Sequence, residues 1–270
     1  MTLPPPRQAP AGLDGAAPRL RVLRHRLRYA LHPATNPMRH FASTRTLYIR
    51  LPKNASNSIM AVLYPGTPPA ALPHFSALYY RRLFPRAFQR HFVFAPLRHP
   101  LDRFASAFTY YRQTSRNPAE RHLMDRTLPH LRTLEDFVLW LNDQPDLESV
   151  PILRWHHFLR QTSYICDTRG RVLTDLLFPV EEMGEGIALL EEITGRRARI
   201  GRLNPSRPHS THGLPMDRIR ALYADDLRLW EQVMRRRLLL FTDPTGLARR
   251  IEPAVEMGQH PCRRPLPGEG

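Results

Sequence analysis

The chain has 270 residues and a formal net charge of +16, which bounds the fold and the partners. A chain of this length can bury one substantial core, so we expect a single α/β domain over residues 19–245, between a disordered Pro-rich tail at 1–18 and a loose Pro/Arg-rich tail at 246–270. The positive charge favours anionic partners. Nucleic acid, an anionic membrane and a phosphorylated cofactor are all compatible with it.

The cysteines and the hydropathy pattern indicate the compartment. Cys166 and Cys262 form neither a CxxC pair nor a zinc-ligand spacing, which favours a reducing compartment and predicts no metal site. The chain has no apolar run of about 18 residues, and its first residues lack the apolar centre of a signal peptide. We therefore expect a cytoplasmic protein.

In chain order, the first patterned segment is basic. Residues 19–31 alternate Arg with Leu and Val, so this segment either packs on the domain or makes peripheral contact with an anionic membrane surface.

The next segment reads as a strand, a tight loop and a helix start. Leu47 to Leu51 alternates apolar and polar side chains, Pro52 ends the run, and Ile59 to Leu63 has helical spacing. The start of a helix leaves backbone N–H groups unpaired at the positive end of its dipole, so this junction predicts a phosphate or sulfate site. Lys53 lies in the loop as the one lysine beside 39 arginines, which suggests that a compact ammonium group matters there.

A second junction of the same kind follows. Residues 90–97 form a continuous apolar run, as expected for a buried parallel strand, and the helical pattern of residues 101–111 follows Arg98-His99-Pro100. Parallel strands end at the same edge of a sheet, so we expect the two junctions to face one ligand site.

The remaining patterns are mostly helical. Helical spacing covers residues 75–83, 118–142, 184–194 and 216–240, with Gly195 ending the third segment, and residues 175–180 predict a further strand. The polar loop with Asn204, Ser206 and Arg207 is a candidate to close over a ligand.

With these segments in place, the chain resembles the carbohydrate-type sulfotransferases of the family 2-like group, which use 3′-phosphoadenosine-5′-phosphosulfate (PAPS). Residues 51–58 are similar to the family's 5′-phosphosulfate loop, and residues 97–108 to its 3′-phosphate motif, Arg-x-Pro-x-x-Arg-x-x-Ser-x-Phe. Residues 157–161 are similar to its His/Trp/Gln segment, and residues 223–226 to its Tyr-x-x-Asp pattern. The chain departs from the family at His99, where an acidic residue or Asn is usual, and at Asn57-Ser58, where Thr-Ser is common.

The resemblance implies a P-loop-like parallel sheet flanked by helices, the sulfotransferase fold. It also implies in-line transfer of a sulfuryl group from PAPS to a hydroxyl, above all on a carbohydrate or a glycoconjugate such as a glycolipid. The residues implied to bind PAPS are Lys53, Asn54, Ala55, Ser56, Asn57, Ser58, Arg98 and Ser106. Arg103 is either a further phosphate contact or a surface or helix-capping cation. No metal is required.

An alcohol acceptor benefits from a base near the attacking oxygen. His74 is the first choice, because it follows the proline-rich connection after the phosphate-loop helix, where several relatives carry an active-site His. His157 is the rival, and Glu181 or Glu182 is the third option.

Two other functions stay open from the residues alone. One is a nucleotide kinase with a degenerate P-loop, which is disfavoured because GxxxxGK[ST] is missing and no acidic residue is evidently placed to hold magnesium. The other is an Arg-rich nucleic-acid-binding protein, whose affinity would fall steeply with salt. On the sulfotransferase interpretation no nucleic-acid partner is expected.

Overall fold

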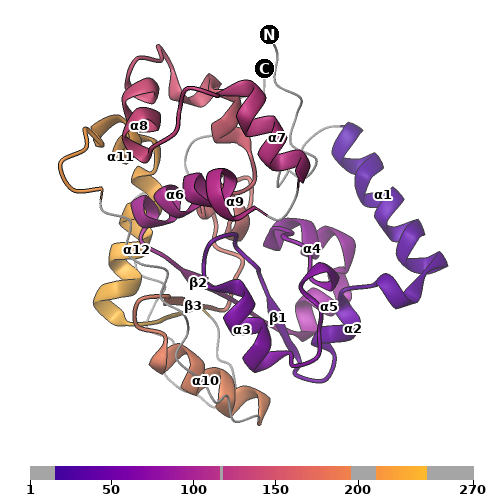
Figure 1. Cartoon of the computed structure of the whole chain (residues 1–270). Helices are drawn as coiled ribbons and strands as arrows, with labels where there is room; N and C mark the ends of the chain where they lie inside the picture. Colours follow the sequence, from indigo (N-terminus) through magenta and orange to yellow (C-terminus); the bar gives the residue numbers. More distant parts are fainter. Residues whose placement is uncertain (1–15, 116–117, 196–210, 242–270) are drawn as a thin grey trace.

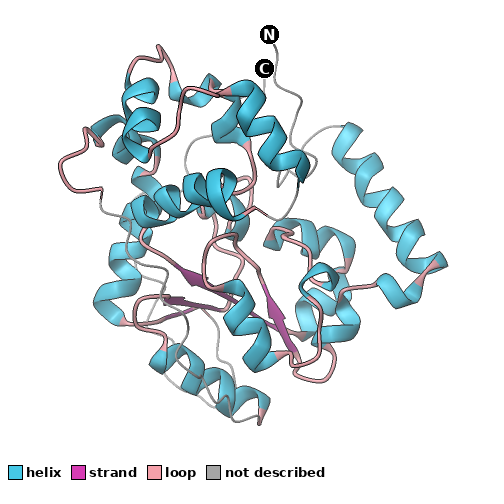
Figure 2. Cartoon of the chain, viewed as in Figure 1, coloured by secondary structure: helices cyan, strands magenta, loops and turns pink. Residues whose placement is uncertain are grey.

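A computed structural model describes residues 16–115, 118–195 and 211–241 (Figure 1). In these ranges a sheet with strand order β1-β2-β3-β4 lies at the centre. The strands β1 (Thr46–Tyr48), β2 (Phe92–Leu97) and β3 (Leu176–Pro179) run parallel, and β4 (Leu239–Leu240) pairs antiparallel to β3. Helices flank this mostly parallel sheet, which confirms the predicted α/β fold with a parallel sheet flanked by helices (Figure 2).

Each parallel strand leads into a helix. The helix α3 (Ser56–Leu63) follows β1, α6 (Pro100–Thr109) follows β2, and α10 (Gly184–Thr194) follows β3. The other helices are α1 (Ala16–Leu31), α2 (Met38–Phe41), α4 (Ala77–Leu83), α5 (Pro85–Arg90), α7 (Pro118–Thr127), α8 (Leu134–Asn142), α9 (Thr162–Ile165), α11 (Asp217–Leu222) and α12 (Ala224–Arg236). A π-helical turn, η3 (Tyr110–Thr114), extends α6. Within the described residues, no helix is both long and apolar enough to cross a bilayer.

Apolar side chains gather in two clusters. The larger one surrounds the sheet, where the rings of Tyr48 and Phe94 stack at 5.0 Å on neighbouring strands. The smaller one lies between α6, α8 and α11, with the ring of Phe104 at 5.4 Å from Phe137 and 5.6 Å from Phe158. This second cluster supports the chain segment that leads into α9 and into the candidate site.

The structure corrects the lengths of several predicted elements. The first strand ends at Tyr48, although the N–H of Ile49 still donates to Phe94 O. Residues 118–142 form α7 and α8, because Thr133 and Asp136 make a capping box that starts a new helix. Residues 216–240 form α11, α12 and β4.

The ends of two helices bear on other predictions. Gly195 ends α10 in the left-handed conformation with φ 65°, as its position predicts. The helix α1 begins at Ala16, so it takes in the end of the segment expected to be a tail. The C-terminal tail, and Asn204, Ser206 and Arg207, lie outside the described residues.

Candidate active site

The loop between β1 and α3 presents backbone N–H groups. Lys53 and Ala55 adopt the left-handed conformation, with φ 67° and 53°, which costs a non-glycine residue about 1–2 kcal/mol. The N–H groups of Ser58 and Ile59 both donate to Ala55 O, at 3.0 and 3.2 Å. Within the described residues, the N–H groups of residues 54–57 have no acceptor. Together with the positive end of the α3 dipole, these groups make the loop a candidate anion site.

Buried side chains fix this loop from below. Nδ2 of Asn54 donates to Pro96 O at 2.8 Å and to Oε1 of Gln161 at 2.7 Å. Nε of Arg103 donates to Pro52 O at 3.1 Å. Asn54, predicted as a ligand-binding residue, therefore offers the site its backbone N–H, while its side chain anchors the loop.

Gln161 joins the two strand-to-helix junctions. Its Oε1 accepts from Asn54 and also from the N–H of Arg98 at 3.0 Å, and its Nε2 donates to Arg98 O at 2.8 Å. The Gln161 side chain is buried. A guanidinium N–H of Arg98 in turn donates to Lys53 O at 3.2 Å. The two motifs therefore meet at one edge of the sheet.

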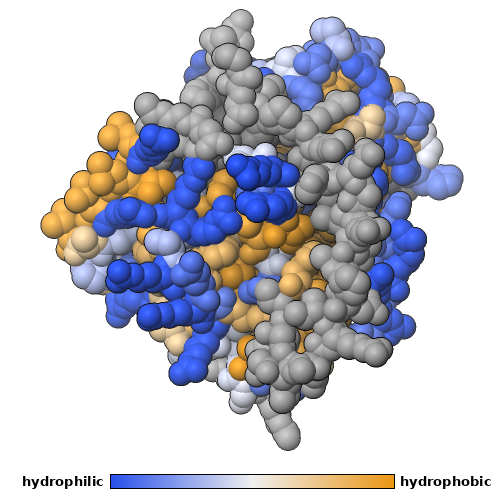
Figure 3. All heavy atoms as spheres, turned by 180° about the vertical axis from the view of Figure 1, so that it is seen from behind, coloured by the Kyte–Doolittle hydropathy of each residue, from blue (hydrophilic) through white to orange (hydrophobic). Residues whose placement is uncertain are grey.

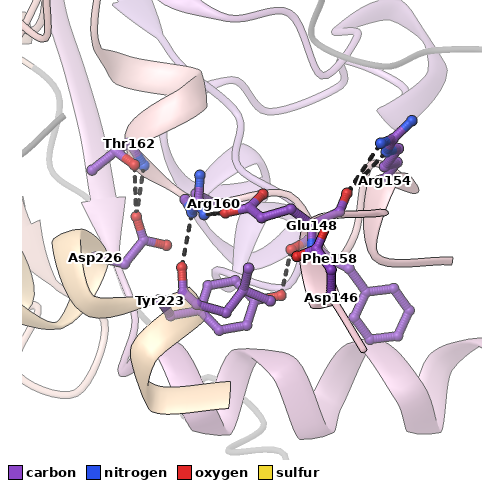
Figure 4. Close-up of polar contacts among 9 residues, drawn as sticks. Asp146, Glu148, Arg154, Phe158, Arg160, Thr162, Tyr223 and Asp226 are labelled. Atoms are coloured by element: carbon purple, nitrogen blue, oxygen red, sulfur yellow. Dashed lines mark hydrogen bonds and ion pairs between the residues drawn. The ribbon is translucent and has the colours of Figure 1, made fainter. Parts of the chain in front are cut away.

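Tyr223 and Asp226 hold the backbone on the two sides of Gln161, and Figure 4 shows their contacts with Phe158 and Thr162. The Asp226 carboxylate accepts from the N–H groups of Gln161 and Thr162, at 2.6 and 2.9 Å, and from the Thr162 hydroxyl at 2.9 Å. The Tyr223 hydroxyl donates to Phe158 O at 2.5 Å. Burial raises the pKa of Asp226, and these hydrogen bonds oppose the rise. The two residues of the Tyr-x-x-Asp pattern thus hold the segment that carries Gln161, and Gln161 in turn holds the two strand-to-helix loops.

Arg160 adds a second tie between the same segments. Its Nε donates to Leu222 O at 2.8 Å, and its guanidinium pairs with the Glu148 carboxylate (Figure 4). Arg160 therefore ties the segment before α9 both to the end of α11 and to the turn that carries Glu148.

Three cations gather around the loop. Burial, and after it the positive charges of Arg98 and Arg103, together lower the pKa of Lys53 to about 8. Nζ of Lys53 lies 4.8 Å from the centre of the Tyr110 ring. The repulsion among these cations is relieved when an anion binds beside them.

The predicted 3′-phosphate residues lie at the second junction. Arg98 is half-buried, and burial lowers its pKa. Ser106 lies on the buried side of α6 and is 4% exposed. Arg103 is buried and donates to Leu159 O at 2.7 Å as well as to Pro52 O, so it braces the loop and is not a surface cation.

The histidine predicted as the base lies beside the phosphate loop. Nδ1 of His74 is 2.7 Å from Arg50 O, and since a carbonyl oxygen can only accept, Nδ1 carries the hydrogen and Nε2 keeps its lone pair. Burial lowers the pKa of His74 to about 3, with the Arg50 charge as the next cause. His74 is therefore neutral at pH 7 in the free protein.

The rival histidine belongs to the same cluster. The ring of His156 lies 3.9 Å from that of His157 and 6.0 Å from that of His74. His157 also lies 4.4 Å from the Tyr110 ring that Lys53 covers. Its pKa is far below the usual value, first because of burial and then because of the neighbouring His156. Within the described residues, no group of three or more His, Cys, Asp or Glu side chains is placed to hold a metal ion.

The acidic alternatives are engaged elsewhere. A Glu181 oxygen accepts from the N–H of His99 at 2.7 Å and so fixes the turn after β2. Glu182 is exposed, and its carboxylate is 3.7 Å from Nε of Arg237.

Sequence reasoning missed two residues of this cluster, Tyr110 and His156. Their positions carried a signal, because Tyr110 follows the helix of the 3′-phosphate motif and His156 directly precedes a candidate base. The predicted Asn57 supplies a backbone N–H, while its side-chain oxygen accepts from Arg50 at 3.1 Å.

The fold and the site define an α/β protein with an anion-binding loop at the carboxyl ends of parallel strands. The family model described as "Sulfotransferase family" matches residues 42–240, which include both junctions, Gln161 and the Tyr-x-x-Asp pattern. The chain therefore belongs to the sulfotransferase family and is family 2-like. Searches of curated proteins and of solved structures gave no match.

Proposed function

We propose that this protein transfers a sulfuryl group from PAPS to a hydroxyl of a carbohydrate or glycoconjugate. The observation that carries the proposal is the meeting of the N–H groups of residues 54–57, which find no acceptor in the part of the chain that the structure describes, with the cations Lys53, Arg98 and Arg103. PAPS carries negative charge at two separate ends, and two anion-binding junctions joined through Gln161 suit such a molecule.

Each of the two junctions would bind a different end of PAPS. Lys53, the N–H groups of residues 54–57 and the hydroxyls of Ser56 and Ser58 would hold the 5′-phosphosulfate. Arg98 and Ser106 would hold the 3′-phosphate. When bound, PAPS supplies a sulfuryl group on a phosphate leaving group.

Lys53 and the loop amides stabilise the charge that develops on the leaving phosphate oxygen. They are fixed in place before the reaction, since the Arg98, Arg103 and Asn54 side chains hold the loop. Each donor of this kind is commonly worth about 3–4 kcal/mol of transition-state stabilisation.

His74 takes the proton from the acceptor hydroxyl. Its Nε2 keeps a lone pair because Nδ1 donates to Arg50 O. Neighbouring positive charges contribute to its low pKa, so an anion bound beside Lys53 raises the pKa toward the range of an effective base. His157 is the second candidate, with Nδ1 at 2.8 Å from the Tyr111 hydroxyl.

The same proposal places the reaction in the cytoplasm. Its support is the cysteine pattern of the sequence, because Cys166 and Cys262 form no CxxC pair, which suits a reducing compartment. Fractionation of producing cells tests this assignment, and recovery of the protein only from an oxidising compartment would contradict it.

A transfer assay tests the reaction. The protein is incubated with PAPS and a set of neutral and acidic saccharides, and release of 3′-phosphoadenosine-5′-phosphate (PAP) is followed. We expect acceptor-dependent release that Lys53→Ala abolishes and that Arg169→Ala, at an exposed arginine in the turn after Cys166, leaves unchanged. Full activity in a folded Lys53→Ala variant would refute the mechanism.

A further inference from the structure

The helix α1 exposes a stripe of leucines. Leu20, Leu23, Leu27 and Leu31 are 67%, 53%, 55% and 74% exposed, and their spacing puts them on one side of the helix. Among the described residues, the other large apolar side chain exposed to this degree is Leu139 on α8. Figure 3 shows an orange patch at its left edge, where α1 lies in that view, flanked by blue side chains.

The opposite side of α1 packs on the domain. Tyr29 is buried, with its ring 5.7 Å from that of Phe84. Nδ1 of His25 is 2.8 Å from the Tyr79 hydroxyl, and its ring is 5.5 Å from that of Phe75. The helix is therefore attached to the domain by one face while the leucine stripe points outward.

Arginines flank the stripe on both sides. At about 100° per residue, Arg21, Arg24 and Arg28 lie on one flank, and Arg19 and Arg26 lie on the other. A helix with an apolar stripe between cationic flanks is typical of segments that lie in the interface of a bilayer.

One flank forms a pocket of about 300 Å³. Arg21, Arg24, His25 and Arg28 line it from α1, and residues 70–75 supply part of the facing wall. After burial, the charges of the three arginines are what lower the pKa of His25. The pocket thus concentrates positive charge beside the leucines and has no carboxylate in its lining.

The surrounding sequence does not neutralise this charge. Residues 15–101 contain 13 arginines and Lys53, and they contain no Asp or Glu. The helices α1, α2, α4 and α5 all fall in this acid-free stretch and lie together at one side of the molecule (Figure 1).

We propose that α1 is a docking surface for an anionic phospholipid bilayer, with the leucine stripe in the interface and lipid phosphates on the flanking arginines and in the pocket. Nucleic acid would engage the arginines and leave the leucines in water. A second copy of this chain, paired through α1, would bring two sets of arginines together without a carboxylate on either helix. An anionic bilayer buries the leucines in its interface and pairs its lipid phosphates with the arginines.

This docking does not depend on sulfuryl transfer, but it places the bilayer close to the candidate site. Pro73 and Phe75 line the pocket, while the intervening His74 contacts Arg50 O. If the proposed function holds, the surface therefore favours lipid-linked acceptors.

Vesicle sedimentation of the full chain tests the docking surface. We expect binding to vesicles that contain phosphatidylglycerol, weak binding to phosphatidylcholine alone, and weaker binding at high salt. The double variant Leu23→Glu/Leu27→Glu should lower the partition coefficient by about tenfold or more, and Arg24→Ala/Arg28→Ala by a similar factor. The matched control is Leu139→Glu, which should bind as the wild type does.

Three results would overturn the proposal. The first is no vesicle binding by the wild type, and the second is unchanged binding by the leucine pair. The third is a protein that does not bind vesicles but forms a dimer that Leu23→Glu/Leu27→Glu dissociates, or binds RNA and keeps that binding in the same variant. Circular dichroism of the same variants detects loss of folding. PAP titration of these variants detects failure of the sulfotransferase site, so neither is mistaken for loss of docking.

Discussion

Gln161→Ala tests whether one buried side chain couples the two anion-binding junctions. The substitution removes three hydrogen bonds: those from Asn54 and the Arg98 N–H at 2.7 and 3.0 Å, and the one to Arg98 O at 2.8 Å. At about 1 kcal/mol net for each bond, the free energy of unfolding should fall by about 3 kcal/mol. In a domain of this size, that loss corresponds to a Tm lower by about 6–12 °C.

The coupling itself is measured with two ligands. In calorimetric titrations, Gln161→Ala should weaken binding of PAP, which spans both junctions, much more than binding of adenosine 5′-monophosphate, which engages one. Gln144→Ala is the matched control, since it removes one half-buried bond, to Trp140 O at 3.0 Å. Equal losses for the two ligands, or a Tm unchanged from wild type, would refute the role assigned to Gln161.

Three further predictions follow from the site. PAP affinity should be flat between about pH 7 and 8, where the PAP phosphates stay fully ionised, and fall above about pH 8, with proton uptake on binding, because a bound anion raises the Lys53 pKa from about 8; affinity that rises above about pH 8 would contradict this. His74→Ala should lower kcat by about 10²–10⁴-fold and keep PAP binding, whereas full activity, with loss in His157→Ala, would assign the base to His157. Tyr223→Phe should lower the free energy of unfolding by about 1–3 kcal/mol in a denaturant titration, because Phe158 O loses its buried donor, and an unchanged midpoint would argue against this bond.

The sequence predicted the parts of the site that depend on local patterns. A strand before Pro52 and a helix that begins a few residues after it are local signals, and the structure has β1 and α3 in that order, although β1 already ends at Tyr48. The second junction and Gly195 at the end of α10 are of the same kind. The predicted helix boundaries were wrong where the apolar spacing continues across a break, as between α7 and α8, because hydrophobic periodicity does not detect a capping residue such as Thr133.

What the sequence could not predict depends on contacts between distant segments. Asn54 and Gln161 are 107 positions apart, so no local pattern indicates that the Asn54 side chain anchors the loop. In an arginine-rich chain Arg103 could equally be a surface cation, and only the packing of α6 against the loop buries it. The cluster of His74, His156 and Tyr110 likewise forms only when three segments meet.

The most direct test of the central claim is calorimetric titration of the purified protein with PAP, without added metal, beside Lys53→Ala and Arg98→Ala. We predict micromolar binding by the wild type, loss in Lys53→Ala, and in Arg98→Ala a larger loss for PAP than for the analogue that lacks the 3′-phosphate. No binding by the folded wild-type protein, together with salt-sensitive binding of nucleic acid, would contradict the claim that this loop holds PAPS.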